Sequence, residues 1–191
     1  MNLTQRVIKR VIDCIASVLG LIILVIPMGI IAILIKLDSN GPVIFKHKRV
    51  GKDGKIFLIY KFRTMVKDAP KIGPPLTQKN DTRITKVGKI LRRTSLDELP
   101  ELINVLKGEM SLVGPRPEIP IEVEKYTEWQ RRVLRLRPGI TGFSQIHGRA
   151  DREIPSKLRL DNWYIKHQSL KLDLWIMAKT VSVILMGKGA Y

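Results

Sequence analysis

Apolar side chains dominate the N-terminal part of the chain, where no charged residue occurs between Cys14 and Ile35. As one straight α-helix this stretch would extend about 33 Å, enough to cross a hydrocarbon core of ~30 Å. Pro27 lies inside the stretch and predicts a kink, because proline lacks the N–H group that the helix needs there. Lysine and arginine flank both ends, so the positive-inside rule favours neither orientation.

Three interpretations of this apolar stretch stay open: a re-entrant membrane helix, a helix that crosses once, and a buried helix of a soluble domain. The re-entrant form is favoured, because a bend near Pro27 keeps both basic flanks on the cytoplasmic side. The predicted organisation is therefore a re-entrant membrane helix over residues 1–38, followed by a cytoplasmic-face domain over residues 39–191 that ends in interfacial helices.

The pattern after the apolar stretch predicts a small β-hairpin and several helices. Two β-prone runs, 43–50 and 56–63, are separated by an Asp53-Gly54 turn, which favours a hairpin. Helical periodicity follows at 86–91, from 97 onward, and at 121–136, 156–167 and 171–186. With Trp163 and Tyr164 nearby, the last helix suits the headgroup layer, although an ordinary buried C-terminal helix fits equally well. The fold class is α+β: a mostly helical, membrane-associated domain.

Charge narrows the choice of partners. The formal net charge is +17, which favours polyanions: nucleic acid, anionic lipid headgroups or phosphorylated substrates. No zinc-ligand spacing and no RNA-recognition motif occurs, so nucleic acid is not expected as a partner. Cys14 is the sole cysteine, which excludes an internal disulfide.

Two adjacent acidic residues stand out at the start of a predicted helix. Ser95 followed by Glu98 has the spacing of a capping box, which would place Asp97 in the first helical turn. Free N–H groups and the positive end of the helix dipole favour a phosphate there. With an ordinary pKa of about 3.9, Asp97 would be ionised at neutral pH and could attack phosphorus.

Basic and polar residues around this pair are candidates for binding phosphates. Lys61 and Arg63 are two apart on one strand and point to the same face, although such a pair is commonly just a solvated face. Arg92 precedes the acidic pair closely. Two prolines fix the backbone around Arg116, which suits bidentate phosphate binding.

Several ordered motifs resemble those of the bacterial sugar transferases, the monotopic phosphoglycosyl transferases. They comprise Tyr60-Lys61-Phe62-Arg63-Thr64-Met65, Ser95-Leu96-Asp97-Glu98-Leu99-Pro100, Asn104-Val105-Leu106-Lys107-Gly108, Ser111-Leu112-Val113-Gly114-Pro115-Arg116-Pro117-Glu118, Arg137-Pro138-Gly139-Ile140-Thr141-Gly142 and Gly148-Arg149. The resemblance covers nearly the whole chain. One position departs from the pattern: Ile26 stands where some members have serine before the membrane proline.

The resemblance implies transfer of a sugar-1-phosphate from a UDP-sugar to a polyprenyl phosphate such as undecaprenyl phosphate, with release of UMP and with Mg²⁺ as cofactor. By the same resemblance Asp97 is the nucleophile, Glu98 helps to hold Mg²⁺ or assists the lipid phosphate, and Arg116 binds the diphosphate. The remaining candidates are Lys61, Arg63, Arg92, Gln145 and Arg149 for substrate binding, and Asp173 beside Asp97 and Glu98 for the metal.

The expected location is the bacterial inner (cytoplasmic) membrane, with the catalytic domain on the cytoplasmic face and membrane lipids as contacts. A homodimer is one arrangement that the sequence leaves open, and the identity of the sugar cannot be deduced. Two rival functions also stay open: a non-enzymatic membrane scaffold, which tolerates Asp97→Asn, and a membrane-anchored nucleic-acid-binding protein, whose affinity would fall steeply with salt.

Overall fold

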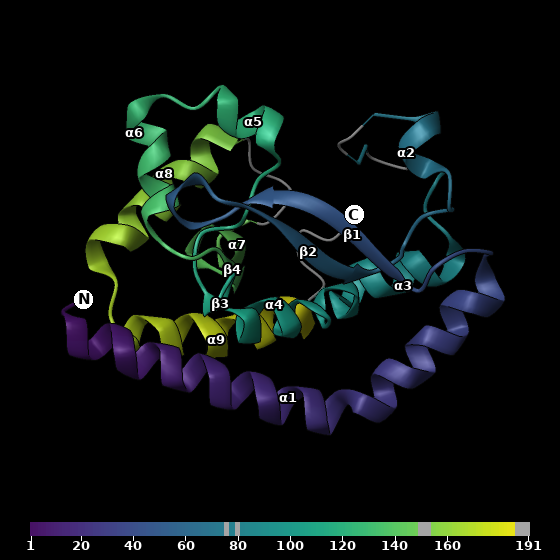
Figure 1. The fold of residues 1–191 in the computed structure, drawn as a ribbon, viewed down its shortest axis with the longest axis horizontal. Coiled ribbons are helices and arrows are strands. Elements are labelled where there is room, and N and C mark those ends of the chain that lie inside the picture. The colour runs from purple at the N-terminus through teal and green to yellow at the C-terminus, as the bar shows by residue number, and fades with distance from the viewer. Residues whose placement is uncertain (75–76, 79–80, 149–153, 186–191) are drawn as a thin grey trace.

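One long bent helix lies along one side of the molecule (Figure 1). The structure is a computed structural model that describes residues 1–74, 77–78, 81–148 and 154–185. Helix α1 (Leu3–Asp38) runs without interruption through Pro27 and is long and apolar enough to cross a membrane. Because Pro27 removes a backbone hydrogen bond, it accounts for the bend visible in Figure 1.

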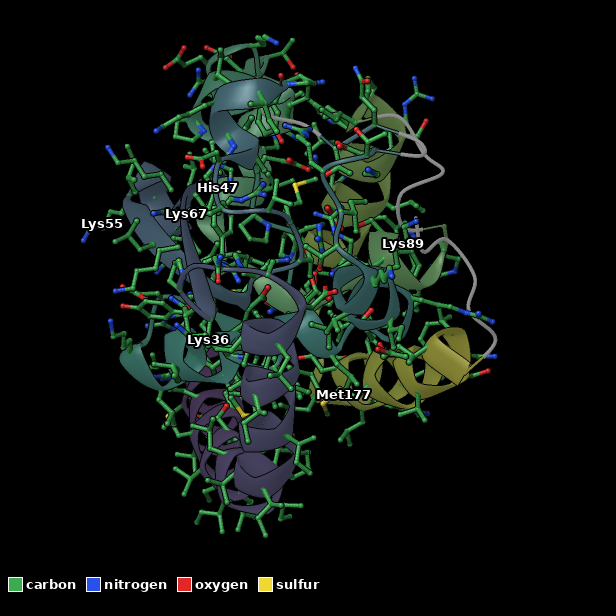
Figure 2. The ribbon with its side chains drawn as sticks, turned by 90° about the vertical axis from the view of Figure 1, so that its right-hand side faces the viewer. Lys36, His47, Lys55, Lys67, Lys89 and Met177 are labelled. Carbon is green, nitrogen blue, oxygen red and sulfur yellow. The ribbon has the colours of Figure 1, made fainter. Side chains whose placement is uncertain are left out.

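The central part of α1 is apolar and faces outward. Ile22, Ile23 and Ile26 are 64–72% exposed, and Val25 is 62% exposed. Figure 2 shows side chains composed almost wholly of carbon projecting from this helix below the body, with Lys36 near its upper end. Exposed apolar surface on this scale is typical of a segment that contacts lipid or another protein.

Both ends of α1 dock on the same body. Near the N-terminal end, Arg10 donates to the carbonyl oxygens of Val105 and Leu106 at 2.7 and 3.1 Å. Asp13 accepts hydrogen bonds from the Ser111 hydroxyl and the Leu112 N–H. At the other end, Ile31 and Ile35 are buried in one apolar cluster with Phe62 and Leu91. The helix therefore leaves the body and returns to it.

The predicted hairpin is confirmed. Strands β1 (Ile44–Val50) and β2 (Ile56–Phe62) pair antiparallel, with Ile44 opposite Phe62 and Val50 opposite Ile56. The turn contains Asp53 and Gly54, both at positive φ, as an Asp-Gly turn requires. A second, parallel pair joins β3 (Ser111–Val113) to β4 (Gly139–Thr141).

Helices surround these two small sheets. Figure 1 shows α4 between the hairpin and α1, with α9 running beside the first part of α1. The helices after α1 are α2 (Ala69–Ile72), α3 (Lys86–Thr94), α4 (Glu101–Lys107), α5 (Pro120–Glu124), α6 (Glu128–Arg131), α7 (Phe143–Ile146), α8 (Ile154–His167) and α9 (Leu170–Leu185).

The single helix predicted over 121–136 is wrong. The segment forms α5, then α6, then a 3-10 turn over Arg132–Arg135. Thr127 causes the break, because its hydroxyl accepts the Gln130 N–H while the Gln130 side chain accepts the Thr127 N–H. This reciprocal capping box starts a new helix in the middle of a continuous helical pattern.

Candidate active site

Asp97 and Glu98 lie in a short 3-10 turn, Leu96–Glu98, between α3 and α4. The predicted capping box is wrong: Ser95 adopts the left-handed conformation, at φ 58°, and ends α3. Helix α4 begins only at Glu101, after Pro100. The acidic pair is thus held by a tight turn between two helices rather than by the first turn of one helix.

Glu98 is the centre of an ion-pair cluster. Its Oε1 atom accepts from Lys61 Nζ at 2.7 Å and from Arg116 Nη2 at 3.0 Å. Burial opposes ionisation, but the charges of Lys61 and Arg116 outweigh it and hold the pKa of Glu98 well below its ordinary value. Glu98 is therefore a fixed negative charge at neutral pH.

Lys61 is held toward the acidic pair by the contact between β2 and α4. The side-chain oxygen of Asn104 accepts the N–H of Tyr60, next to Lys61, at 3.0 Å. The amide nitrogen of Asn104 donates to Leu58 O and to Glu109, so this fully buried side chain is satisfied at both ends. Strand β2 is thereby fixed to α4, and the lysine that follows Tyr60 reaches Glu98.

Arg116 is carried by a rigid backbone, as its two prolines predict. Gly114 N donates to Thr141 O, and Gly139 N donates to Pro115 O, each at 2.9 Å. A side chain on Gly114 would lie 2.4 Å from a backbone oxygen of Arg137, so glycine is required for this close approach. The β3–β4 pair thus anchors the segment that directs Arg116 toward Glu98, and the charge of Glu98 raises the pKa of Arg116.

Asp97 has a different environment from Glu98. Burial raises the pKa of Asp97 to about 6, and repulsion from Glu98 raises it further. The positive charges of Lys61, Arg92 and Arg116 act in the opposite direction. Within the part of the chain that the structure describes, its carboxylate has no ion-pair partner within 4.0 Å. Arg92 lies close enough to Asp97 for its positive charge to lower the Asp97 pKa. The Nε atom of Arg92 donates to the Thr64 hydroxyl at 2.8 Å. The Asp97 carboxylate is thus less engaged than that of Glu98.

The sequence argument missed Glu101. This residue is 2% exposed, and its Oε1 lies 3.1 Å from Lys61 Nζ. Burial raises the pKa of Glu101 to about 7, with Lys61 opposing the shift and Glu98 adding to it. The spacing of Asp97, Glu98 and Glu101 could have predicted that Glu101 lies near the acidic pair, because residues three and four apart share one face of a helix.

Two candidates predicted from the sequence, Arg63 and Asp173, are not brought to the acidic pair. Arg63 is buried and donates to the carbonyl oxygens of Ser39 and Asn40, so Lys61 and Arg63 do not converge on one diphosphate site. Asp173 accepts from Lys9 and Tyr164 at 2.7 and 2.6 Å, joining α9 to α1 and α8. Arg149 lies outside the described residues.

The predicted metal trio of Asp97, Glu98 and Asp173 is not assembled as a single cluster. Residues 1–74, 77–78, 81–148 and 154–185 contain no group of three or more histidine, cysteine or acidic side chains placed to hold a metal ion. Asp97 and Glu98 alone fit Mg²⁺, which is usually held by one or two carboxylates together with substrate phosphates. Of the two, Glu98 already accepts from two cations, which leaves the Asp97 carboxylate less engaged.

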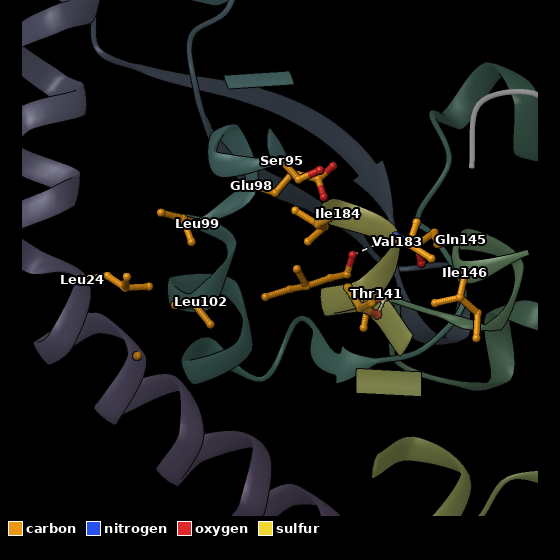
Figure 3. Close-up of a pocket in the computed structure, with 13 residues that line it drawn as sticks. Leu24, Ser95, Glu98, Leu99, Leu102, Thr141, Gln145, Ile146, Val183 and Ile184 are labelled. Carbon is orange, nitrogen blue, oxygen red and sulfur yellow. Dashed lines mark hydrogen bonds between the residues drawn. The ribbon is translucent and has the colours of Figure 1, made fainter. Parts of the chain in front are cut away.

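A cavity of about 310 Å³ adjoins the acidic pair. Glu98 and Ser95 lie at one end, and side chains of α1, α7 and α9 form other walls, among them Leu24, Gln145 and Val183 (Figure 3). Gln145 is buried and donates to Ile140 O at 2.8 Å. Its position on this wall is compatible with the predicted contact to substrate.

Comparison with known proteins places the chain among sugar transferases. Residues 4–187 match the model of a family described as bacterial sugar transferase. An undecaprenyl-phosphate galactose phosphotransferase of Salmonella typhimurium is 41% identical over 98% of this chain and 42% of its own length. An Aeromonas hydrophila protein named UDP-N-acetylgalactosamine-undecaprenyl-phosphate N-acetylgalactosaminephosphotransferase is 42% identical over 96% of the chain and 45% of its own length.

Shorter relatives match over most of their length. The uncharacterized sugar transferase EpsL of Bacillus subtilis is 40% identical, over 96% of this chain and 90% of its own length. By contrast, the chain spans less than half the length of the Salmonella and Aeromonas proteins. The matched region of those larger proteins corresponds to the whole body described above.

Proposed function

The chain belongs to the bacterial sugar transferase family, and on that premise we propose that it transfers a sugar-1-phosphate from a UDP-sugar to a polyprenyl phosphate. The observation that carries the proposal is the charge arrangement around Asp97. Two adjacent carboxylates lie near three cations: Lys61 of β2, Arg92 of α3 and Arg116 of the segment after β3. Both substrates are phosphates, and such an arrangement would bind them while leaving one carboxylate as nucleophile.

The proposed reaction has two displacements. An oxygen of Asp97 attacks the phosphorus that bears the sugar, and the bond from that phosphorus to the bridging oxygen breaks, so UMP leaves with the electron pair. A phosphate oxygen of the lipid then attacks the same phosphorus. The bond to Asp97 breaks and the carboxylate is regenerated, while the sugar now sits on a polyprenyl diphosphate.

The other residues stabilise charge during these steps. Arg116 and Lys61 would neutralise the diphosphate of the donor, and Arg92 would hold Asp97 ready by its positive charge. Asp97 and Glu98 would hold Mg²⁺, which supplies further neutralisation of the phosphate oxygens when it is bound. Glu98 keeps Lys61 and Arg116 in place through its two ion pairs.

An intact-mass measurement tests this function. The protein is mixed with Mg²⁺ and a panel of UDP-sugars without acceptor, and we expect one of them to add the mass of its sugar-phosphate to the protein while UMP appears. Adding undecaprenyl phosphate should then remove the extra mass. A protein that releases UMP only when the acceptor is present, with no covalent adduct, would contradict the two-step reaction.

We also propose that α1 is re-entrant in the inner membrane, with the body on the cytoplasmic face. The support is that both of its ends dock on one body, while its middle exposes isoleucine and valine around the bend. Single cysteines placed at positions 2 and 40 in a Cys14→Ala background should both react with a membrane-impermeant maleimide only from the cytoplasmic side. Labelling of the two positions from opposite sides would exclude this topology.

The pH dependence of the first step should follow Asp97. Because its pKa is raised to about 6, the ionised nucleophile is lost as the pH falls through that value. We expect kcat/KM for the UDP-sugar, which reflects the free enzyme, to fall roughly tenfold between about pH 7.5 and pH 5. An Asp97 with an ordinary pKa of about 3.9 would leave the rate nearly unchanged over this range, and a flat profile would contradict the prediction.

A further inference from the structure

The cavity beside the acidic pair has two distinct ends. At one end lie Ser95 and Glu98, next to Asp97. At the other, Gly20 and Leu24 belong to α1, close in sequence to the exposed Ile22, Ile23 and Val25. Figure 3 shows Leu24, Leu99 and Leu102 on one side of the cavity and Val183 and Ile184 on the other. The cavity therefore connects Glu98, the neighbour of Asp97, with the apolar stretch of α1.

Hydrocarbon makes up most of the lining, and its polar groups are largely engaged. Thr180 donates to Ile176 O at 2.8 Å, so Thr141 donates to Thr180, 2.7 Å away. Gln145 donates to Ile140, and Glu98 accepts from two cations. Among the described residues of the wall, the Gln145 side-chain oxygen is the one polar side-chain atom that is buried without a hydrogen-bond partner.

This chemistry discriminates between the substrates. A sugar or a uridine carries many hydroxyl and amide groups, each of which costs free energy when it is buried without a hydrogen bond. An isoprenoid chain carries none and gains free energy when it leaves water for apolar walls. A wall made mostly of hydrocarbon, whose polar groups are largely engaged, suits the chain and does not suit the sugar.

We propose that this cavity holds the first isoprene units of the polyprenyl phosphate acceptor, an inference that rests on the proposed function. The chain would enter sideways from the bilayer between α1 and α9, past Leu24 and Val183. Its phosphate would then stop at the end marked by Glu98, near Lys61 and Arg116, in position to attack a phosphorus held on Asp97. Lateral entry lets the lipid reach the site without leaving the membrane.

Val183→Trp fills the cavity and tests the proposal against a matched control, Val181→Trp. Val181 is 59% exposed, lies on the same helix and does not line the cavity. We expect Val183→Trp to form the sugar-phosphate adduct at a rate within twofold of Val181→Trp. Its kcat/KM for undecaprenyl phosphate should fall at least tenfold, and its kcat/KM for a ten-carbon analogue, which carries the same first isoprene units, should fall by a similar factor.

Two results would overturn the proposal. Equal acceptor kinetics in the two variants would show that the cavity does not hold the chain. Loss of adduct formation in a folded Val183→Trp variant would mean that the cavity holds the sugar of the donor. Should Val183→Trp not fold, Leu24→Phe on the opposite wall replaces it, with the same expectations and the same contradicting results.

A binding experiment separates this inference from the reaction itself. A farnesyl phosphate that carries a photoreactive diazirine on its first isoprene unit should crosslink to cavity residues of α1 and α9, and unlabelled undecaprenyl phosphate should compete. Crosslinking in a protein that forms no adduct with any UDP-sugar would retain the lipid site and reject the proposed function. Crosslinking only outside the cavity would reject the lipid site whatever the activity.

Discussion

Asp97→Asn is expected to abolish sugar-phosphate transfer while leaving the protein at least as stable as the wild type. The amide has the shape of the carboxylate but no charge, and it cannot form the acyl-phosphate bond that the proposed first step requires. Removal of a nucleophile commonly lowers turnover by three orders of magnitude or more. We therefore expect both the covalent adduct and UMP release to fall below roughly a thousandth of the wild-type rate.

The stability of this variant follows from the environment of the carboxylate. Burial raises the pKa of Asp97 to about 6, so the folded state binds its proton more tightly than the unfolded state does. Such a group stabilises the fold at low pH, and that contribution is lost as the pH rises through about 6. At neutral pH the ionised side chain thus destabilises the protein, by on the order of 1–3 kcal/mol. Asparagine removes that penalty.

Both quantities can be measured on one preparation. Turnover is followed by UMP release, and the free energy of unfolding by thermal denaturation in detergent at about pH 7.5 and pH 5. The control is Asp53→Asn, since the Asp53 side chain is 61% exposed in the hairpin turn. Asparagine also tolerates its positive φ. An Asp97→Asn variant with near-normal turnover would favour the rival scaffold or another nucleophile, and a strongly destabilised one would contradict the buried-charge argument.

Local sequence signals were sufficient for elements that local interactions decide. The hairpin was predicted at 43–50 and 56–63 and is found at Ile44–Val50 and Ile56–Phe62, because an Asp-Gly turn between β-prone runs specifies it. The end of α4 at Gly108 was likewise predictable, since Gly108 adopts the positive φ that ends helices.

Long-range contacts decided the features that the pattern could not predict. Ser95 and Glu98 have capping-box spacing, yet Glu98 forms ion pairs with Lys61 and Arg116, which lie far from it in the sequence. Strand alternation predicts that Lys61 and Arg63 share one face, but it cannot tell how far a long side chain reaches. Arg63 at the strand end turns back to the segment after α1. The sequence pattern therefore identified Lys61, Arg63 and Glu98 as candidates, but it did not predict which groups each of them contacts in the fold.

Lys61 forms ion pairs with Glu98 of the acidic pair and with Glu101. We therefore expect the second large effect from Lys61→Met, which should lower the free energy of unfolding by about 3–5 kcal/mol. Lys61 is the cation between Glu98 and Glu101, at 2.7 and 3.1 Å, and all three side chains are at most 15% exposed. Methionine has a similar volume but leaves Glu101 without the ion pair that it has in the structure. The cost then comes from the lost attraction between Lys61 and the two carboxylates, and from the proton that Glu101, whose pKa is already about 7, then takes up, rather than from lost packing.

A double-mutant cycle isolates that cost. Neutralising Glu101 as well, in Lys61→Met/Glu101→Gln, should restore a large part of the lost stability, because the remaining Glu98 still pairs with Arg116. The exposed hairpin residue Lys48 offers the matched control, and Lys48→Met should change the free energy of unfolding by less than about 0.5 kcal/mol. For a chain of this size, the predicted loss in Lys61→Met corresponds to roughly 6–20 °C in melting temperature.

The same cycle reports on the reaction. Lys61 lowers the pKa of Asp97, so its removal should shift the acid limb of the kcat/KM profile toward higher pH, in addition to weakening the binding of the donor diphosphate. Glu101→Gln removes a negative charge from the cluster, whereas Lys61→Met removes a positive one. We expect the double variant to recover stability but not turnover. Recovery of both would mean that Lys61 only supports the fold, whereas recovery of stability alone places its positive charge on the substrate phosphates.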